Sequence, residues 1–389
     1  MTERGHYDPA QGPLAGSRVI EFCQVAAGPF CGLLLADMGA DVIKVEPPAG
    51  DSMRAWPPHT GGYGENFAAL NRNKRSVMLD LKTDDGRKAA LALIASADVV
   101  IENNRPGVMD RLGLGYAAVA AGRPNLVYCS ISAFGQTGPR AVDGGFDVSV
   151  QAASGIMSIT GERDGPPAKA GVPVSDMATG LYAAYAIAAI LRRVALGGPG
   201  GQVDMTMLGA SLGFAAFQTS EFYGNRVDPV RHGSAHPRNA PYQSFKAADG
   251  YFVVAAGNDK LWQSVCAVLK RPDLGADPRF QTTALRAKNQ IELASLLQAE
   301  FQHRTVAAWA QDFRAAGVPC EPVNSISEAL ASPQVAHMGW VQPLPLPNGR
   351  ATETVVSPFV INGQSQTVGR RPPDLGEHNQ EILESVRNK

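Results

Sequence analysis

Short apolar runs alternate with amphipathic stretches in the first half of the chain. Residues 17–23 form an apolar run, a loop follows at 24–28, and residues 29–38 are predicted to form a helix that begins with proline. A second apolar run at 41–45 comes next. A helical crossover between two such strands predicts that they pair in parallel.

The same alternation continues to about residue 207. Further strands are predicted at 76–81, 99–102, 126–131 and 202–207, with helices at 85–95 and 177–195. Strands that alternate with helices indicate an α/β fold, in which helices cover both faces of a parallel sheet. We therefore expect a doubly wound, Rossmann-like large domain.

The pattern changes after about residue 224. Residues 225–239 are rich in Arg, His, Gly and Pro and are predicted to form a linker or a long loop. Two strands at 242–246 and 251–255 flank the turn Ala248-Asp249-Gly250, which predicts a hairpin. The helices predicted next lie at 259–269, 291–302 and 305–316. This order indicates a second, smaller α+β domain.

Proline punctuates the last part of the chain. Strands are predicted there at 341–347 and 353–361, and a final helix follows Asp374. The length of 389 residues favours two domains, because single cores stop growing at about 250–300 residues. The domain hypothesis is a large α/β part at 1–200, a segment and linker at 201–239, a small domain at 240–325, and a linker and return at 326–389.

The composition is that of a packed protein without a strong net field. Hydrophobic residues make up 44% of the chain, and 35 basic residues nearly balance 36 acidic ones. No general attraction to nucleic acid or to an anionic membrane is therefore expected. The first residues lack the apolar core of a signal peptide, and no charge-free apolar run reaches the length of about 18 residues that a membrane span requires.

Cysteine and histidine usage also limits the function classes. The cysteines are an odd, scattered set with no C-x-x-C pair, at Cys23, Cys31, Cys129, Cys266 and Cys320. Free thiols of this kind indicate a reducing cytoplasm rather than a disulfide framework. The seven histidines are dispersed, so no metal site is expected.

A nicotinamide-binding domain is one interpretation of the first strand-helix-strand unit, with Glu46 as the ribose-binding acid. The loop reads QVAAGPF, with one glycine where the dinucleotide fingerprint has three. Side chains at the missing glycine positions would keep the backbone away from a pyrophosphate. A dinucleotide site is therefore disfavoured.

Asp176 lies between a loop and a long Ala-rich helix, in the segment VPVSDMATGLYAAYAIAAILRR. One interpretation is a helix N-cap, because Asp accepts hydrogen bonds from the first free N–H groups of a helix. The other is a carboxylate nucleophile, which the positive end of the helix would keep ionised. Spacing alone does not decide between them.

Seven segments, in order over residues 12–383, resemble the class III coenzyme A transferases, the family of formyl-CoA and carnitine-CoA transferases. They are GPFCGLLLADMGADVIKVEPPAGD, NRNKRSVMLDLK, ADVVIENNRPGVMDRLGLGY, SISAFGQTGP, GGFDVSVQAASGIMSITG, AGVPVSDMATGLYAA and DLGEHNQEIL. The resemblance implies that Asp176 is the nucleophile and that CoA moves between carboxylic acids through an aspartyl anhydride and an aspartyl-CoA thioester. It also implies that Asp147 is an acid beside the reaction centre.

The resemblance further implies where CoA and substrate are held. The positions that match are Gln24, Val25, Ala26, Ala27, Leu79, Lys82, Asn103, Asn104, Arg105, Arg111 and Phe146, with Arg54 and, more loosely, Lys74 and Arg75. CoA is a substrate in this family, so no bound cofactor is expected. The implied fold is a large domain made from both ends of the chain, with a smaller inserted domain, in a homodimer whose subunits interlock like rings.

Some residues depart from the family pattern. Pro47 stands where some members carry an arginine, and the small domain lacks the Gly-rich run of formyl-CoA/oxalate enzymes. A dicarboxylate such as succinate, mesaconate or itaconate is the alternative, with His232, His236 and Arg238 as candidate contacts. Those three residues are equally consistent with an ordinary linker.

Two other functions remain open on the same fold. The related α-methylacyl-CoA racemases use a histidine directly before the acid that matches Asp147, and Phe146 stands there in this chain. A side chain that cannot carry a proton favours transfer over racemisation. A non-catalytic acyl-CoA-binding protein is the third alternative.

Overall fold

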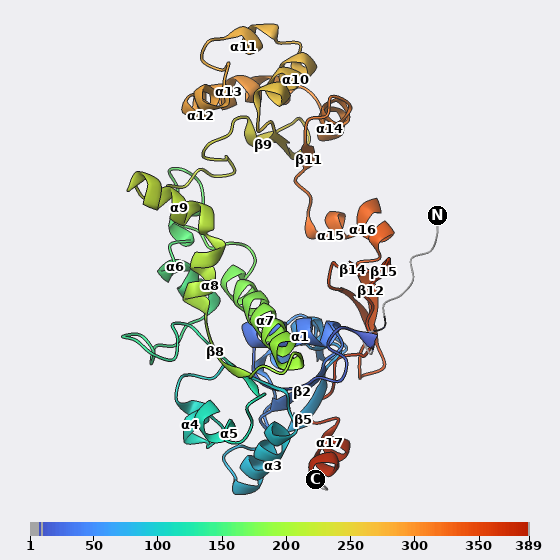
Figure 1. The fold of residues 1–389 in the computed structure, drawn as a ribbon. Coiled ribbons are helices and arrows are strands. Elements are labelled where there is room, and N and C mark those ends of the chain that lie inside the picture. Colours follow the sequence, from blue (N-terminus) through green and yellow to red (C-terminus); the bar gives the residue numbers. More distant parts are fainter. Residues whose placement is uncertain (1–7, 9–10, 388–389) are drawn as a thin grey trace. The chain divides into compact units, whose positions relative to one another are not determined.

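The computed structural model describes Asp8 and residues 11–387, which divide into two compact units (Figure 1). The first unit comprises Met1–Ile156, Lys169–Val227 and Pro333–Lys389, and the second comprises Met157–Ala168 and Asp228–Ser332. Both ends of the chain thus belong to the first unit. The segment Met157–Ala168, which the sequence places within the large domain, belongs to the second unit.

A six-stranded parallel sheet forms the centre of the first unit, in the order β5-β2-β1-β6-β7-β8. Its strands are β1 (Arg18–Phe22), β2 (Asp41–Glu46), β5 (Arg75–Met78), β6 (Val99–Glu102), β7 (Val127–Ser132) and β8 (Gly201–Thr206). The chain winds outward in one direction from β1 and in the other from β6. The predicted doubly wound parallel sheet is therefore confirmed, with its switch point between β1 and β6.

Helices cover both faces of this sheet. Alternation along β1 directs Val19 to a core shared with α1 (Ala27–Asp37) and α7 (Val174–Ala195), and Ile20 to a core on the opposite face. The opposite core includes side chains of α3 (Asp84–Ala95), α4 (Val108–Arg111), α5 (Tyr116–Val119) and α17 (Asn379–Arg387). The result is a three-layer α/β/α arrangement.

The first unit contains further helices and strands. They are η2 (Ser52–Ala55), β3 (His59–Thr60), β4 (Tyr63–Gly64), α2 (Glu65–Asn71), α6 (Asp147–Ala153), α8 (Met207–Phe214), α9 (Ala216–Asn225), α16 (Pro333–Met338), β12 (Val341–Pro345), β13 (Ala351–Val355), β14 (Val360–Ile361) and β15 (Gln364–Ser365).

The C-terminal segment lies against the edge strand β5. The backbone N–H of His378 donates to the carbonyl of Ser76, and the Ser76 N–H donates to Nδ1 of His378. The side chain of Asn379 accepts from the N–H of Met78. These contacts cover an edge that would otherwise present unpaired strand groups.

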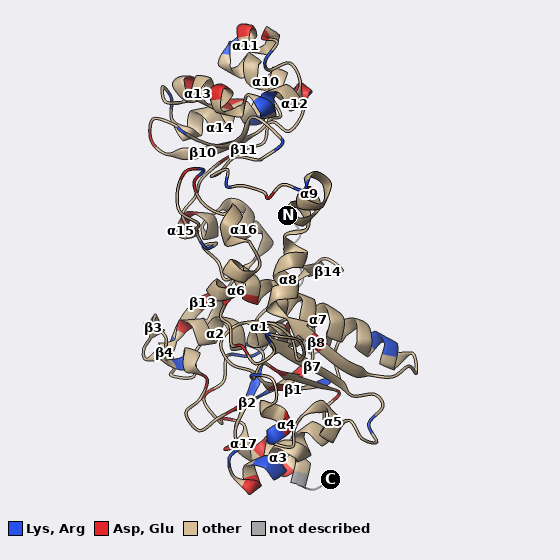
Figure 2. Ribbon diagram, turned by 90° about the vertical axis from the view of Figure 1, so that its left-hand side faces the viewer, with Lys and Arg blue, Asp and Glu red and all other residues tan. Residues whose placement is uncertain are grey.

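Four charged side chains are buried beneath α1, on the face of the sheet that this helix covers, namely Glu21, Lys44, Asp51 and Lys74. Figure 2 shows the charged positions within the strands. The Glu21 carboxylate accepts from Nζ of Lys44 at 3.1 Å and from Nζ of Lys74 at 2.8 Å. Lys44 also donates to the Cys23 carbonyl and pairs with Asp51 at 2.9 Å. Both lysines use all three N–H donors, so this neutral network has no unpaired ammonium proton.

The network explains a glycine in α1. A Cβ at Gly32 would lie 1.9 Å from the Glu21 carboxylate. Lys74 donates as well to the Pro29 carbonyl at 2.7 Å, which joins the network to the first turn of α1. The helix can therefore lie over the buried ion pair only with glycine at position 32.

The second unit has a three-stranded antiparallel sheet in the order β11-β10-β9. Its elements are η3 (Met157–Ile159), β9 (Tyr242–Lys246), β10 (Tyr251–Ala255), α10 (Asp259–Leu269), α11 (Pro272–Ala276), α12 (Thr283–Lys288), α13 (Gln290–Phe301), α14 (Val306–Ala315), β11 (Cys320–Pro322) and α15 (Ile326–Leu330). Aromatic side chains such as Trp262 and Phe301 fill a separate core. The predicted hairpin and the three predicted helices are all present.

Several expectations about boundaries are wrong. Helix α1 begins at Ala27 rather than residue 29, and α7 begins at Val174 rather than 177. The strand predicted at 353–361 ends at Val355, because Pro358 interrupts the pairing before β14 begins. The linker that was predicted to begin at residue 326 contains α15 and α16.

Among the described residues, α7 is the one helix that is long and apolar enough to cross a membrane. Its Ala183, Ala184 and Ile187 pack in the core beneath α1. A core helix of a folded domain can have the same length and composition as a membrane span, and α7 is such a core helix here.

Candidate active site

A cavity of about 320 Å³ opens at the carboxyl ends of β1, β6, β7 and β8. Nine of the predicted site residues line it, namely Gln24, Val25, Ala26, Ala27, Asn103, Asn104, Arg105, Phe146 and Asp176. This edge, at the switch point between β1 and β6, is where ligands bind in open parallel sheets. The structure thus brings the loops after β1 and β6 together with the start of α7.

The loop between β1 and α1 is anchored on two sides. The N–H of Gln24 donates to the Asn103 side chain, which donates back to the Gln24 carbonyl. The N–H of Val25 donates to both oxygens of Asp51, each at 3.3 Å. Ala26 is the N-cap of α1 and has no side-chain acceptor, so the N–H groups of Ala26 and Ala27 have no partner among the described residues.

Asp176 is the third residue of α7 and not its N-cap, so the N-cap interpretation is wrong. Pro173 occupies the cap position and offers no side-chain acceptor. The Asp176 carboxylate is half-buried, lines the cavity, and accepts no hydrogen bond from any described residue. Its oxygen atoms are therefore available to a ligand.

The first N–H groups of α7 donate to a carboxylate that belongs to another helix, α6. Oδ1 of Asp147, the first residue of α6, accepts from the N–H of Ser175 at 2.9 Å and from that of Asp176 at 3.4 Å. Oδ2 of Asp147 accepts from buried Gln151 at 2.6 Å, and Gln151 in turn accepts from the N–H of Ala170. Asp147 therefore holds the start of α7, and Asp176 with it.

The charge state of Asp176 differs from the expectation of a strongly ionised helix-end carboxylate. Burial, followed by the negative charge of Asp147, raises the pKa of Asp176 to about 7. The Asp147 carboxylate is bound to the first turn of α7, which carries Asp176, and the like charge of one carboxylate disfavours ionisation of the other. Asp176 is consequently a more basic carboxylate than an ordinary aspartate.

Helices α1 and α7 pack closely against each other at Gly180, next to the cavity. A Cβ at Gly180 would lie 2.8 Å from the Ala27 carbonyl and 2.9 Å from the Phe30 ring. Gly180 is one turn after Asp176, and residues at this spacing lie about 5–6 Å apart on one helix face. The glycine therefore lets the start of α1 approach the helix turn that carries Asp176.

Five predicted site residues do not line the cavity. They are Asp147, Arg54, Leu79, Lys82 and Arg111. Arg54 is bound by both oxygens of Glu46 at 2.7 Å and by the Pro373 carbonyl, and Leu79 is buried after β5. Lys82 and Arg111 are exposed, and their charged groups have no partner among the described residues. Their predicted roles stay predictions.

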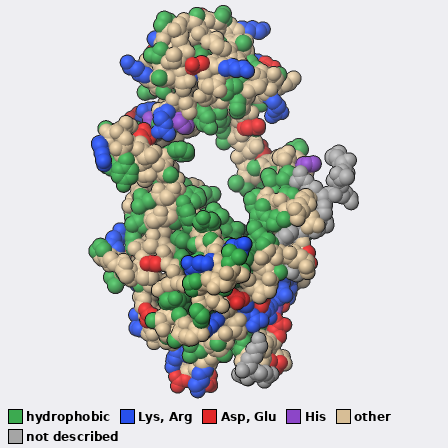
Figure 3. Space-filling model, viewed as in Figure 1, with side chains coloured by type: hydrophobic (Ala, Val, Ile, Leu, Met, Phe, Trp, Pro, Cys, Tyr) green, Lys and Arg blue, Asp and Glu red, His purple; other side chains and the backbone are tan. Residues whose placement is uncertain are grey.

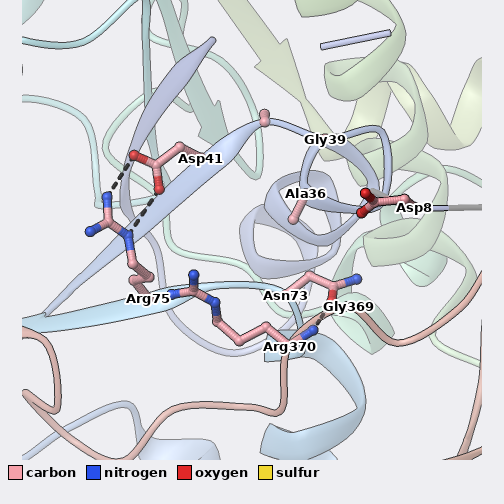
Figure 4. A pocket seen from close by; sticks show the side chains of 9 residues that line it. Asp8, Ala36, Gly39, Asp41, Asn73, Arg75, Gly369 and Arg370 are labelled. Carbon is pink, nitrogen blue, oxygen red and sulfur yellow. Dashed lines mark hydrogen bonds and ion pairs between the residues drawn. The ribbon is translucent and has the colours of Figure 1, made fainter. Parts of the chain in front are cut away.

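Lys74 and Arg75, the two cations that the resemblance implies more loosely, do not line this cavity. Lys74 has no exposed surface, and its three donors are taken by Glu21, Pro29 and Asn71, so its predicted role as a CoA contact is wrong. Arg75 lines a different cavity, of about 340 Å³, at the amino end of the sheet (Figure 4). It is paired there with Asp41 and with Glu381.

The cavity also includes residues that the sequence did not predict. They are Ile131, Ser132, Ala133, Gly145 and Met207. Four of them end or follow strands that were predicted, so the rule that ligands bind at the carboxyl ends of parallel strands would have found them. Glu46, the acid of the dinucleotide interpretation, is buried and bound by Arg54 and Ser76, which leaves it no role at a ribose.

The predicted loop residues His232, His236 and Arg238 belong to the second unit, where Arg163 lies 3.2 Å from Nδ1 of His232. Their contact with substrate stays a prediction. The described part of the chain contains no group of three or more His, Cys, Asp or Glu side chains that could hold a metal ion. All five cysteines are free, as predicted, and the structure shows that all five are buried.

Asp176, a basic carboxylate that accepts no hydrogen bond from any described residue, thus lines the same cavity as Ala26 and Ala27 at the switch point of the parallel sheet. Comparison with known proteins identifies the family. Residues 14–379 match CoA-transferase family III, and the chain belongs to this family.

Curated relatives are similar over nearly the whole chain. A succinate–glutarate CoA-transferase of Agrobacterium fabrum is 40% identical, with 98% of this chain and 97% of the relative covered. A succinyl-CoA:mesaconate CoA-transferase of Haloarcula hispanica is 36% identical, with 96% of each chain covered. The crystal structure of a CAIB/BAIF family protein from Brucella suis superimposes with a TM-score of 0.86 at 37% identity, covering 96% of this chain and 99% of the other.

The raised pKa of Asp176 predicts a stabilising active-site substitution. The unfolded chain binds this proton with a pKa of about 3.9, so the folded protein loses stability as the pH rises from there through about 7. Asp176→Asn removes this effect and breaks no hydrogen bond. Its melting temperature should exceed that of the wild type at pH 8, with a difference that shrinks toward pH 4.

Asp143→Asn is the matched control, because Asp143 is an exposed carboxylate whose one ion pair, with Arg140, lies at the surface. It should show no such pH-dependent gain. Thermal melts of the three proteins between pH 4 and pH 8 make the comparison. A melting temperature of Asp176→Asn below that of the wild type at pH 8 would contradict the account.

Proposed function

We propose that the protein is a CoA transferase that moves CoA from an acyl-CoA donor to a dicarboxylic acid, with Asp176 as the nucleophile. The observation that carries this proposal is the free, basic carboxylate of Asp176 in the cavity where the loops after β1 and β6 meet. Membership of CoA-transferase family III supports the reaction class.

The first half-reaction forms two covalent intermediates. A carboxylate oxygen of Asp176 attacks the thioester carbonyl, the C–S bond breaks, and CoA leaves as the thiolate from a mixed anhydride. The thiolate then attacks the aspartyl carbonyl, the anhydride C–O bond breaks, and the donor acid leaves as its carboxylate. The enzyme is left as an aspartyl-CoA thioester.

The second half-reaction reverses these steps with the acceptor. The acceptor carboxylate attacks the aspartyl-CoA carbonyl and releases the thiolate, which then attacks the acceptor carbonyl of the new anhydride. Asp176 returns as a carboxylate, and no net proton is taken up or released. The raised pKa of Asp176 makes this carboxylate a stronger nucleophile, while leaving a share of it ionised near neutral pH.

Each tetrahedral intermediate carries an oxyanion that needs hydrogen-bond donors. Ala26 and Ala27 line the same cavity as Asp176, and their N–H groups, which have no partner among the described residues, are our candidates for these donors. Asp147 contributes by holding the start of α7 through the N–H groups of Ser175 and Asp176. It thereby positions the nucleophile without itself reacting.

Three cations are suited to the phosphates of CoA. Arg105 lines the cavity, Arg111 and Lys82 are exposed, and none of the three charged groups has an ion pair among the described residues. Charge-assisted hydrogen bonds to phosphate oxygens are among the stronger polar contacts in proteins. Asn103 and Asn104, which precede Arg105 in the chain, line the same cavity.

The proposed acceptor class is supported by the relatives, whose names include succinate, glutarate and mesaconate. A second carboxylate on the acceptor would need a cation, for which Arg238 with His232 and His236 stays our candidate. A racemase is disfavoured, because Phe146 lines the cavity with a 74% exposed side chain where a proton-carrying histidine would be required.

We also infer a cytoplasmic homodimer with interlocked subunits. Hydrophobic side chains gather over α7 and α8 (Figure 3), and exposed ones continue along α9. They include Leu181, Tyr185, Leu212, Phe214, Phe217 and Tyr223. A contiguous apolar surface of this kind supports a protein partner, and five free cysteines support a reducing compartment.

An acceptor screen tests the function directly. With succinyl-CoA or acetyl-CoA as the donor, we expect transfer to dicarboxylates such as glutarate and mesaconate, and little transfer to oxalate or formate. Product CoA esters would be identified by mass spectrometry. The absence of transfer to every dicarboxylate with both donors would contradict the proposal, as would rapid deuterium exchange at the α-carbon of 2-methylacyl-CoA without any acceptor.

Substitution of the exposed cations tests the CoA site. Arg111→Ala and Lys82→Ala should each raise the donor KM about tenfold or more, since a hydrogen bond to a charged group contributes about 1.5–3 kcal/mol. Their melting temperatures should not change, because neither charged group has a partner among the described residues. Unchanged donor kinetics in both variants would show that the phosphates bind elsewhere.

Lys74→Met is the matched contrast for these two variants. It leaves Glu21 buried with only one of its two lysine partners, and breaking a buried ion pair costs about 3–5 kcal/mol. This variant should therefore lose thermal stability, whereas a specific rise in donor KM at unchanged stability would return Lys74 to the list of CoA contacts.

A further inference from the structure

Val25 has an unusual backbone conformation for its residue type. Its φ angle is 68°, in the left-handed region, and it is the one β-branched residue among the described non-glycine residues with positive φ. Branched side chains are strongly disfavoured in this conformation, which persists only where surrounding contacts impose it. The strain lies in the wall of the cavity that contains Asp176.

Asp51 is the residue that imposes the conformation. Both of its carboxylate oxygens accept from the Val25 N–H at 3.3 Å, and Oδ1 also accepts from the Met53 N–H at 3.0 Å. Asp51 is 1% exposed, and the ammonium group of Lys44 lies 2.9 Å from its Oδ2. Burial acts to raise the pKa of Asp51, but Lys44 and the backbone donors hold it below its usual value. The anchor is therefore a charged one.

The turn at Val25 determines where the next N–H groups point. Ala26 and Ala27 follow directly, and their N–H groups have no other partner among the described residues. Gln24 is held separately by Asn103, so the chain enters the turn from a fixed position. The φ angle of Val25 therefore sets the direction of the N–H groups of Ala26 and Ala27, two residues that line the cavity.

We propose that Asp51 is a positioning residue for CoA transfer, which acts through Val25 to hold the main-chain N–H groups of Ala26 and Ala27 toward the reacting carbonyl. This inference rests on the proposed function. Asp51 has no contact with the reacting atoms, and a loss of its charge affects the chemical step through the backbone of this turn.

A double-mutant cycle separates this role from a purely structural one. Asp51→Asn keeps the shape of the side chain but loses the ionic anchor, and we expect kcat to fall about ten- to hundredfold, with a smaller change in the donor KM. Glycine adopts positive φ without strain. In a Val25→Gly background, the loss caused by Asp51→Asn should therefore be much smaller.

Equal losses in the valine and glycine backgrounds would overturn the proposal, because independent sites have additive effects. Asp37→Asn is the matched control. Asp37 is a buried carboxylate at the other end of α1, where Arg72, Asn73 and Ser357 bind it. This variant should lose stability but keep kcat, whereas a kcat loss equal to that of Asp51→Asn would show that both effects are structural.

Amide hydrogen exchange tests the anchor without any activity. Peptides that cover residues 24–27 should exchange faster in Asp51→Asn than in the wild type at matched stability, and unchanged exchange would overturn the anchoring role. If the wild type transfers no CoA to any acceptor, the proposed function fails while this exchange experiment still decides whether Asp51 holds the Val25 turn.

Discussion

The buried carboxylate of Glu21 is the constraint on which the arrangement of the first unit depends. It lies in the covered face of the sheet and binds two lysines, one from the adjacent strand β2 and one that precedes β5. Replacing such a network with apolar residues can be neutral for stability, but removing one member is costly. Its effect here is geometric, because Lys74 reaches the first turn of α1 and Lys44 reaches Asp51.

Two acidic side chains then determine the geometry of the candidate active site, each through backbone N–H groups of another segment. Asp51 holds the turn that begins α1, and Asp147 holds the first turn of α7. Gly180 allows these two helix starts to approach. The cavity between them contains a carboxylate that burial and Asp147 keep basic, together with Ala26 and Ala27, whose N–H groups have no partner in the described part of the chain.

The sequence predicted the six strands of the large sheet, their parallel pairing and nine cavity residues, because apolar periodicity and collinear motifs are local properties. It did not predict the first turn of α7, since the acceptor for that turn comes from Asp147 rather than from the residue before the helix. Lys74 was misplaced for a similar reason. A lysine among charged neighbours predicts a solvated cation, and its burial follows from a partner, Glu21, 53 residues away.

The covalent state of Asp176 tests the account most directly. The protein is incubated with donor acyl-CoA, treated with hydroxylamine, and digested for peptide mass mapping. We expect a hydroxamate on Asp176 that forms only when the donor is present, together with loss of activity, and neither label nor transfer in Asp176→Asn. Full transfer activity in Asp176→Asn, or a donor-dependent label on a different residue, would contradict it.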